Sequence, residues 1–349
     1  MERPQPLRCC RDVMQGVIRG YQGRSKPLSL LLTCVLLLAG GCRGRKAPGI
    51  GPERLQATWH GEFALSSAAP ADRLKLLDWN IERGLQFEKV KDTIAREDPG
   101  LCILQEVDLH ADRTDDLNVA EELARANGYN YVFGIEFQEL GEGSPTTPAY
   151  HGQATLSRLP IRSHRVLRFL TQSNFWKQRP FIPNLAAFQR RVGGRMALIS
   201  EIAWNERSLV VYNVHLESRM PADGRLRQLQ ELLEDMEVYP PETPIVLAGD
   251  FNARSHPRQL INRLESAGFR AAVTTREPTA PPEDSTASSL VESALSLMTG
   301  AEPRGNDRSI DWVFVRGPLS FERGRVHADV DASDHYPVSA EITLIEAQP

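Results

Sequence analysis

Short apolar runs bounded by polar residues or turn formers recur between residues 74 and 345, and each predicts a strand of five to eight residues. They are LKLLDWNI, LCILQEV, YNYVFGIEF, GQATLSRLPI, MALISEIAW, SLVVYNVHL, TPIVLAGDF, SIDWVFVR and VSAEITLI. Helical periodicity lies between some of them, at residues 87–97, 118–127, 224–237 and 257–267. Strands packed between a helix layer and a second sheet produce this mixture, so we predict an α/β sandwich with two packed sheets and outer helices.

The composition fits one large soluble domain. The chain has 349 residues, of which 41% are hydrophobic and 25% are charged, as in ordinary globular proteins. After residue 72 the sequence shows no internal repeat and no second long linker. We therefore predict a single domain over residues 73–349 and a monomer.

The first 72 residues differ in composition from the rest. Five arginines and one lysine precede an apolar run from Leu28 to Ala39 that ends in small residues, which is typical of an export signal and too short for a spanning helix. The ending LAGGC resembles the lipobox of bacterial lipoproteins, which implies acylation of Cys42; a plain signal peptide or an uncleaved anchor helix is the alternative. We predict a signal peptide over residues 1–41, a flexible tether over residues 42–72 and a bacterial envelope protein anchored to a membrane through Cys42.

Charge and cysteine content argue against two kinds of site. Residues 1–41 carry six basic and two acidic residues, so the formal net charge of the remainder is −8, against −4 for the whole chain. An acidic body does not favour long nucleic acid, because basic residues that neutralise phosphates supply most of that affinity. Four of the five cysteines lie in the first 42 residues, so Cys102 alone cannot build a disulfide framework or a thiolate zinc site.

Polar residues that can do chemistry stand at the ends of several apolar runs. They are Asn80, Glu106, His215, Asp250, Asn252, Asp311, Asp334 and His335. A carboxylate directly after a buried strand is costly unless it is paired or bound to a cation. Carboxylate and amide oxygens, with few histidines and no thiol, suit Mg²⁺, Mn²⁺ or Ca²⁺ better than zinc.

Seven segments make the pattern specific. WNIERG, LQEVD, HGQATLSRLPI, YNVHLES, LAGDFNA, SIDWVFV and SDHYPVSAEI occur in the order and rough spacing of the endonuclease/exonuclease/phosphatase family, the group that includes DNase I-like enzymes. The resemblance covers about residues 74–345. It implies a four-layer α/β/β/α sandwich with two mixed sheets, and a metal-dependent phosphoesterase that uses Mg²⁺ or Mn²⁺.

The resemblance also implies a metal site and one substrate contact. Glu106 would be the principal metal ligand, with Asn80 beside it and Asp334 contributing. Where the family often has Gly-Asn before A-x-L-S-R, this chain has Gly152-Gln153, so Gln153 is a substrate-binding candidate whose longer amide departs from the pattern. Each residue has a structural alternative: a turn cap for Asn80 and a surface acid for Glu106.

The remaining matched residues would act on the phosphate. The resemblance implies that His335 is a general base or a phosphate-stabilising group, oriented by Asp311. His215 would face the phosphate from the opposite side, and Asp250 and Asn252 would position the attacking water and bind phosphoryl oxygens. The alternatives are a core histidine at His215 and a simple turn at Asp250-Phe251-Asn252. His110, His164, His256 and His327 have no motif around them and are interpreted as surface residues.

Two long insertions lie between the matched segments. Residues 167–192 mix aromatic residues with Lys177, Arg179, Arg190 and Arg191, which is compatible with closure over a substrate, contact with a membrane surface or an irregular hairpin. Residues 275–308 begin Pro-rich and acidic, which is typical of a mobile loop.

We predict from these features a metal-dependent phosphodiesterase that acts in the bacterial envelope on a lipid or small-molecule phosphodiester. A metal-dependent endonuclease or exonuclease is the first alternative, so nucleic acid stays a possible partner that the charge does not favour. A catalytically silent binding module of the same fold is the second alternative, supported only by the departure at Gln153.

Overall fold

The computed structural model describes residues 51–64, 72–144, 146–177, 190–273, 277–281 and 308–345. The predicted signal peptide and Cys42 lie outside the described residues, as do residues 65–71 of the predicted tether and residues 178–189, 275–276 and 282–307 of the two insertions. Within the described ranges, no helix combines the length and the apolar character needed to cross a bilayer.

Eight strands of the described chain form the first sheet. In spatial order they are β1 (Thr58–Gly61), β4 (Asn130–Gly143), β5 (Pro148–Ser157), β3 (Leu101–Leu109), β2 (Arg73–Arg83), β14 (Val338–Leu344) and β13 (Leu319–Val326), with β7 (Arg191–Gly193) paired to β4. β2 and β3 run parallel, and the other pairings among these strands are antiparallel. The sheet is therefore mixed.

Six described strands form the second sheet. Their order is β11 (Arg270–Ala271), β12 (Asp311–Arg316), β10 (Ile245–Asp250), β9 (Arg207–His215), β8 (Met196–Trp204) and β6 (Ile161–Arg168). β9 and β10 run parallel, whereas β12 runs antiparallel to β10. The carboxyl ends of β9 and β10 and the amino end of β12 therefore meet at one edge of the sheet.

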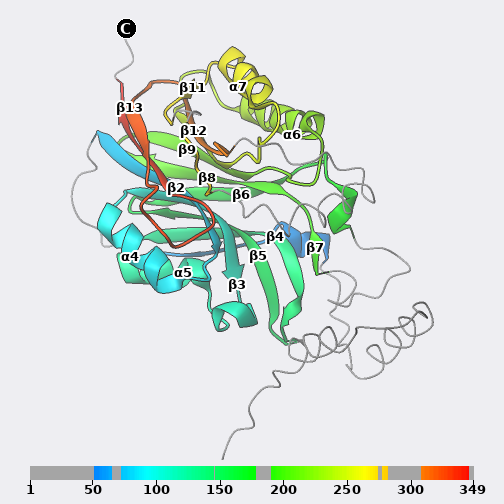
Figure 1. Ribbon diagram of the computed structural model, residues 1–349. Helices are drawn as coiled ribbons and strands as arrows, with labels where there is room; N and C mark the ends of the chain where they lie inside the picture. Colours follow the sequence, from blue (N-terminus) through cyan, green and yellow to red (C-terminus); the bar gives the residue numbers. More distant parts are fainter. Residues whose placement is uncertain are drawn as a thin grey trace, which may run out of the picture. The chain divides into compact units, whose positions relative to one another are not determined.

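Helices cover the outer face of each sheet (Figure 1). α4 (Phe87–Glu97) and α5 (Val119–Asn127) lie against the first sheet, and α6 (Ala222–Asp235) and α7 (Pro257–Ser266) lie against the second. α5 shows how the sequence sets helix ends: the Asn118 side chain accepts a hydrogen bond from the Glu121 amide at its start, and Gly128 takes a left-handed conformation at its end. Short helices complete the described chain: α3 (Pro52–Leu55), η1 (Asp112–Thr114), η2 (Asn174–Trp176) and η3 (Met236–Val238).

Three apolar layers hold the sandwich together. One lies between the first sheet and α4 and α5, a second between the second sheet and α6 and α7, and a third between the two sheets. Trp79 and Trp312 show the pattern, since each is fully buried on a strand between two layers. The predicted four-layer α/β/β/α sandwich with two mixed sheets is confirmed.

Two expectations from the sequence are corrected. Residues 51–64 of the predicted tether contain α3 and β1, and β1 pairs antiparallel with β4. The reason is apolar packing, because Trp59 contacts Phe133 and Phe63 stacks on Tyr131 at a ring-centroid distance of 6.1 Å. His327, interpreted as a surface residue, is only 2% exposed and contacts the Ser339 hydroxyl.

Candidate active site

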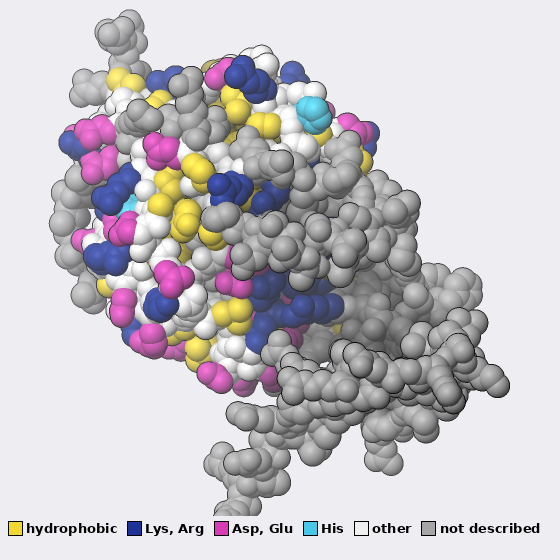
Figure 2. Space-filling model, viewed as in Figure 1, with side chains coloured by type: hydrophobic (Ala, Val, Ile, Leu, Met, Phe, Trp, Pro, Cys, Tyr) yellow, Lys and Arg dark blue, Asp and Glu magenta, His cyan; other side chains and the backbone are white. Residues whose placement is uncertain are grey.

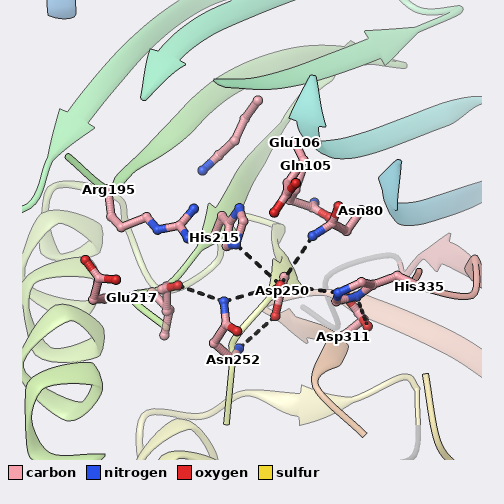
Figure 3. Close-up of polar contacts among 12 residues, drawn as sticks. Asn80, Gln105, Glu106, Arg195, His215, Glu217, Asp250, Asn252, Asp311 and His335 are labelled. Carbon is pink, nitrogen blue, oxygen red and sulfur yellow. Dashed lines mark hydrogen bonds and ion pairs between the residues drawn. The ribbon is translucent and has the colours of Figure 1, made fainter. Parts of the chain in front are cut away.

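A histidine and an aspartate from distant segments form a buried pair. Nδ1 of His335 lies 2.9 Å from Oδ2 and 3.0 Å from Oδ1 of Asp311 (Figure 3). Asp311 begins β12, and His335 lies in the loop just before β14. Trp79 on β2 fixes that loop, since its indole nitrogen donates to the carbonyl oxygen of His335. The pair therefore spans both sheets.

Asp250 lies at the centre of the site. Strand register places it directly beside His215 on β9 and Asp311 on β12. Its Oδ2 lies 3.4 Å from Nε2 of His215, 3.9 Å from Nε2 of His335 and 3.4 Å from Nδ2 of Asn80. Residues that are far apart in the sequence thus surround one carboxylate, as Figure 3 shows.

The turn after β10 holds Asn252 against the same carboxylate. The Asn252 amide donates to Oδ1 of Asp250 at 2.8 Å, and its side-chain nitrogen lies 3.3 Å from Oδ2. Asn252 has a φ of 49°, a left-handed conformation that asparagine tolerates better than most residues. Gly249 is required just before the turn, because its φ is 142° and a Cβ there would lie 1.9 Å from the Val214 carbonyl oxygen.

Glu106 and Asn80 lie on the first-sheet side of the site (Figure 3). Asn80 pairs in register with Gln105, the residue before Glu106. Glu106 has a φ of 51°, and its carboxylate lies 3.4 Å from the guanidinium of Arg83. Burial acts to raise the pKa of Glu106, but the charges of Arg83 and the neighbouring cations hold the pKa well below its ordinary value. Glu106 is therefore ionised.

The environment raises the pKa of both a histidine and an acid. Burial acts to lower the pKa of His335, but the charge and hydrogen bond of Asp311 outweigh burial and raise the pKa to about 10. Burial, together with the charge of Asp311, raises the pKa of Asp250 to about 6, although the His335 charge opposes the rise. At neutral pH His335 is a hydrogen-bond donor, and Asp250 is a carboxylate more basic than usual.

His215 is neutral. Burial and the charge of Arg195 lower the pKa of His215 well below its ordinary value. Arg195 points toward His215 in Figure 3 and is 4% exposed, and it forms an ion pair of 2.9 Å with the buried Glu136. His215 therefore offers one N–H donor and one acceptor nitrogen to the site, without a charge.

The residues present fit a divalent metal ion. Ligand atoms of Asp250, Asp311 and His335 lie within 4.8 Å of one another. The Glu106 carboxylate lies on the other side, and Asn80 directs its amide nitrogen at Asp250 while its oxygen accepts from the Glu82 amide. The nitrogen atoms around Oδ2 of Asp250 lie 3.3–3.9 Å away, beyond the usual hydrogen-bond length of about 2.9 Å. A loosely surrounded carboxylate with a raised pKa is a position where a cation would stabilise the ionised form.

Two predicted site residues lie apart from this group. Asp334 is exposed, although its charge still helps to raise the pKa of His335. Gln153 is fully buried on β5, where its amide nitrogen donates to Glu136 and to the Met196 carbonyl oxygen. Its longer side chain thus supports Glu136 inside the fold, and its position gives no support to the predicted contact with substrate.

Three residues that the sequence did not single out support the site. Thr279, in the second insertion, is fully buried and donates to Oδ2 of Asp311 at 2.5 Å. Its hydroxyl oxygen also accepts from the backbone amides of Ile310 and Asp311, each at 3.1 Å. The other two are Arg195, beside His215, and Glu217, a buried acid that accepts from Ser173. Thr279 and Arg195 stand in none of the matched segments, whereas Glu217 lies in YNVHLES, two residues after His215, but was not assigned a role.

Comparisons with known proteins agree with this geometry. The model of the Endonuclease/Exonuclease/phosphatase family matches residues 79–335, more than half of the chain. No curated protein matches. Members of the family are hydrolases that act on phosphate esters and depend on metal ions.

Solved structures show the same fold. An endonuclease/exonuclease/phosphatase from Beutenbergia cavernae has a TM-score of 0.56 at 19% identity, covering 78% of this chain and 72% of that one. A functionally unknown conserved protein from Enterococcus faecalis gives 0.51 at 20% identity, and a family protein from Leptotrichia buccalis gives 0.52 at 16%. Both comparisons cover 78% of this chain and 100% of the other. This chain belongs to the endonuclease/exonuclease/phosphatase family.

Proposed function

We propose that this protein is a metal-dependent phosphodiesterase that hydrolyses a lipid or small-molecule phosphodiester in a bacterial envelope. The observation that carries the proposal is the buried His335–Asp311 pair, with Nε2 of His335 directed at Asp250. An imidazolium and a basic carboxylate that face each other supply the donor and the proton acceptor that hydrolysis requires.

Asp250 is the proton acceptor for the attacking water. Its pKa of about 6 lies closer to neutral pH than that of an ordinary aspartate, so it is ionised and still basic enough to take a proton. The amide of Asn252 fixes one carboxylate oxygen at 2.8 Å and leaves the other facing the histidines. The attacking water would therefore lie against Oδ2.

His335 stabilises the charge that develops on phosphorus-bound oxygen. With its pKa raised to about 10, it carries a proton on Nε2, while Nδ1 donates to Asp311. Fixed donors aimed at a developing charge supply much of the rate enhancement in phosphoryl transfer. Of the two roles that the sequence left open, phosphate stabilisation fits this protonation state better than general-base catalysis.

His215 and Asn252 complete the polar wall. His215 is neutral and lies 3.4 Å from Asp250, so it can donate one hydrogen bond to a phosphoryl oxygen without repelling Arg195. The Asn252 amide group is held by the Leu216 carbonyl oxygen at 3.0 Å. Both side chains are thus oriented before a substrate arrives, which lowers the entropy lost on binding.

Glu106 and Asn80 are the residues that would hold the metal ion, which leaves Asp250 to take the proton. A bound Mg²⁺ or Mn²⁺ would offset charge on the phosphoryl oxygens and assist departure of the leaving oxygen. Because the donors are oxygens of carboxylate and amide groups, a hard cation fits them better than zinc.

The proposed substrate class rests on charge and on Cys42. The chain after residue 41 has a formal net charge of −8, and acylation of Cys42 would keep the enzyme at a membrane. On the face shown in Figure 2, Lys and Arg side chains lie among Asp and Glu side chains, apart from one compact group beside the undescribed residues. A compact basic group suits a small anionic molecule or headgroup better than a long polyanion.

The test is hydrolysis by the full-length protein purified in detergent. The substrates are bis-p-nitrophenyl phosphate, p-nitrophenyl phosphate, sphingomyelin and plasmid DNA, each with Mg²⁺, Mn²⁺ or EDTA. We expect metal-dependent cleavage of a diester that Glu106→Ala abolishes. Preference for DNA would favour the nuclease, and inactivity on every substrate without metal binding would favour the binding module. A mass shift of the Cys42 peptide by acyl groups tests the anchor.

A further inference from the structure

Three arginines gather on the side of the site away from His335. Arg83 ends β2, Arg191 begins β7 and Arg195 precedes β8; we name them the arginine cluster. The charges of Arg83 and Arg195 both act on Arg191. The charges of Arg83 and Arg191 lower the pKa of Glu106, and the charge of Asp250 acts to raise the pKa of Arg195. The cluster therefore borders the proposed catalytic groups.

The arginine cluster holds more buried donors than the protein satisfies. Arg191 and Arg195 are 7% and 4% exposed, and the side chain of Arg83 is 24% exposed. The Nε atoms of all three are buried and have no hydrogen-bond partner among the described residues. An unpaired buried donor is costly for the folded protein, so such a group calls for an explanation such as a function.

The acidic residues beside the arginine cluster pair with only some of its N–H donors. Arg191 binds Glu139 at 2.8 Å and Arg195 binds Glu136 at 2.9 Å, each through one terminal nitrogen. Arg83 lies 3.4 Å from Glu106, which is longer than a strong charged hydrogen bond. Since a guanidinium carries five N–H donors, each arginine keeps capacity for further acceptor oxygens.

Aromatic rings hold the cluster in place. The Arg191 guanidinium lies 5.3 Å from the ring centroids of both Phe137 and Trp176. Arg195 lies 5.4 Å from the ring of Phe137. Cation–π contacts fix the planes of the guanidinium groups without using their N–H donors. The first insertion supplies Trp176, so part of it belongs to the border of the site.

We propose that the arginine cluster binds a second phosphate group of the substrate, a proposal that rests on the proposed phosphodiesterase function. Planar guanidinium groups with unsatisfied N–H donors match the oxygens of a phosphate dianion. The scissile phosphate would lie against Asp250 and His335, which are 3.9 Å apart, and the second phosphate would lie on the Glu106 side, at the arginine cluster. The substrate is thus a phosphodiester that also carries a phosphate monoester, on a soluble molecule or on a lipid headgroup.

The first experiment measures anion binding without catalysis. Isothermal titration calorimetry of the full-length protein with inorganic pyrophosphate in EDTA should show binding. The affinity for pyrophosphate should fall about tenfold or more in Arg83→Gln, since hydrogen bonds between charged groups are lost. The double variant Arg191→Gln/Glu139→Gln, which leaves no buried charge unpaired, should give the same loss. Arg125→Gln, at an exposed arginine on α5, is the control and should bind as wild type. Absence of binding by wild type, or equal binding by all variants, would overturn the proposal.

The second experiment compares two substrates that differ by one phosphate. Thymidine 5′-(p-nitrophenyl phosphate) and its 3′-phosphorylated form should differ about tenfold or more in KM, and Arg83→Gln should remove the difference. Hydrolysis of both with equal KM would refute the second subsite but leave the phosphodiesterase intact. Anion binding in EDTA with no hydrolysis would instead refute the phosphodiesterase. Phosphatidic acid vesicles and glycerol 3-phosphate are then compared as inhibitors of hydrolysis of the 3′-phosphorylated substrate. Stronger inhibition by the vesicles assigns the second phosphate to a lipid, and stronger inhibition by glycerol 3-phosphate assigns it to a soluble molecule. Inhibition by neither contradicts the proposal.

Discussion

Oδ2 of Asp311 accepts a hydrogen bond from the Thr279 hydroxyl at 2.5 Å and also lies 2.9 Å from Nδ1 of His335. A residue of the second insertion thus stabilises the position of the Asp311 carboxylate, which in turn orients His335. The Thr279 carbonyl oxygen also accepts from the amide of Tyr336, the residue after His335. One buried threonine therefore holds both members of the pair, and its loss has consequences that can be measured.

Replacement of Thr279 by valine should lower both stability and kcat. Valine keeps the shape but leaves the amides of Ile310 and Asp311 without this acceptor, and Oδ2 of Asp311 keeps only His335 as a partner. Each unsatisfied buried group costs about 1–3 kcal/mol. Urea unfolding gives the stability, and kcat and KM are measured on bis-p-nitrophenyl phosphate. Thr279→Ser, which restores the hydroxyl, should recover both. A valine variant with wild-type kcat would show that Thr279 does not position Asp311.

Replacement of His335 by alanine should reduce kcat by about a hundredfold or more, the usual contribution of one positioned acid–base group. KM should change less, because the wall formed by His215 and Asn252 remains. The protein should stay folded, as judged by its urea midpoint. A purified variant with near-normal turnover would remove His335 from the mechanism.

The strands and the meeting of polar side chains at their ends were predictable because both depend on local patterns. Apolar runs of strand length mark β2 and β10, and the residues that follow them, such as Asp250, are brought together by simple parallel pairing. Gln153 was different: the motif marked the position, but the length of the amide let it reach Glu136 in the interior. A sequence pattern identifies a position more reliably than the direction of its side chain.

The arginine cluster and Thr279 could not be predicted for a physical reason. Arg191 comes to the site only because β7 pairs with β4, in a register that opposes Arg191 to Glu139. Thr279 acts from a segment whose composition is typical of a loop. Both placements depend on contacts between residues distant in the sequence, which leave no local periodicity.

Cys102 should be unreactive in the folded protein. It is fully buried on β3, and burial raises the pKa of its thiol to about 12. Since the thiolate is the reactive form, iodoacetamide at pH 8 should leave Cys102 unmodified and should label it after denaturation in guanidinium. Peptide mass mapping separates this thiol from those near the N-terminus. Labelling of native Cys102 at the rate of a free thiol would contradict its burial.

Stability should fall as the pH drops below about 6.5, the ordinary pKa of histidine, and His327 should contribute to this fall together with His215. Burial lowers the pKa of His327, and the positive charges of Arg325 and Lys75 lower it further. The negative charges of Glu97, 3.5 Å away, and of Asp329 oppose this shift without cancelling it. The unfolded chain therefore takes up a proton that the folded chain resists, and stability present above the ordinary pKa is lost as the pH falls toward the lower folded value.

Glu97 acts in the same direction at lower pH. Burial acts to raise the pKa of Glu97, but its hydrogen bond to Lys75 and the charge of His327 lower the pKa, so its contribution is lost as the pH falls through the folded value. Urea midpoints at pH 7.5, 6.5 and 5.5 should decline for wild type and for His256→Gln, at an exposed histidine. They should decline less for His327→Gln, which cannot take up the proton. Equal slopes for the two variants would show that the buried histidine is not the group that senses pH.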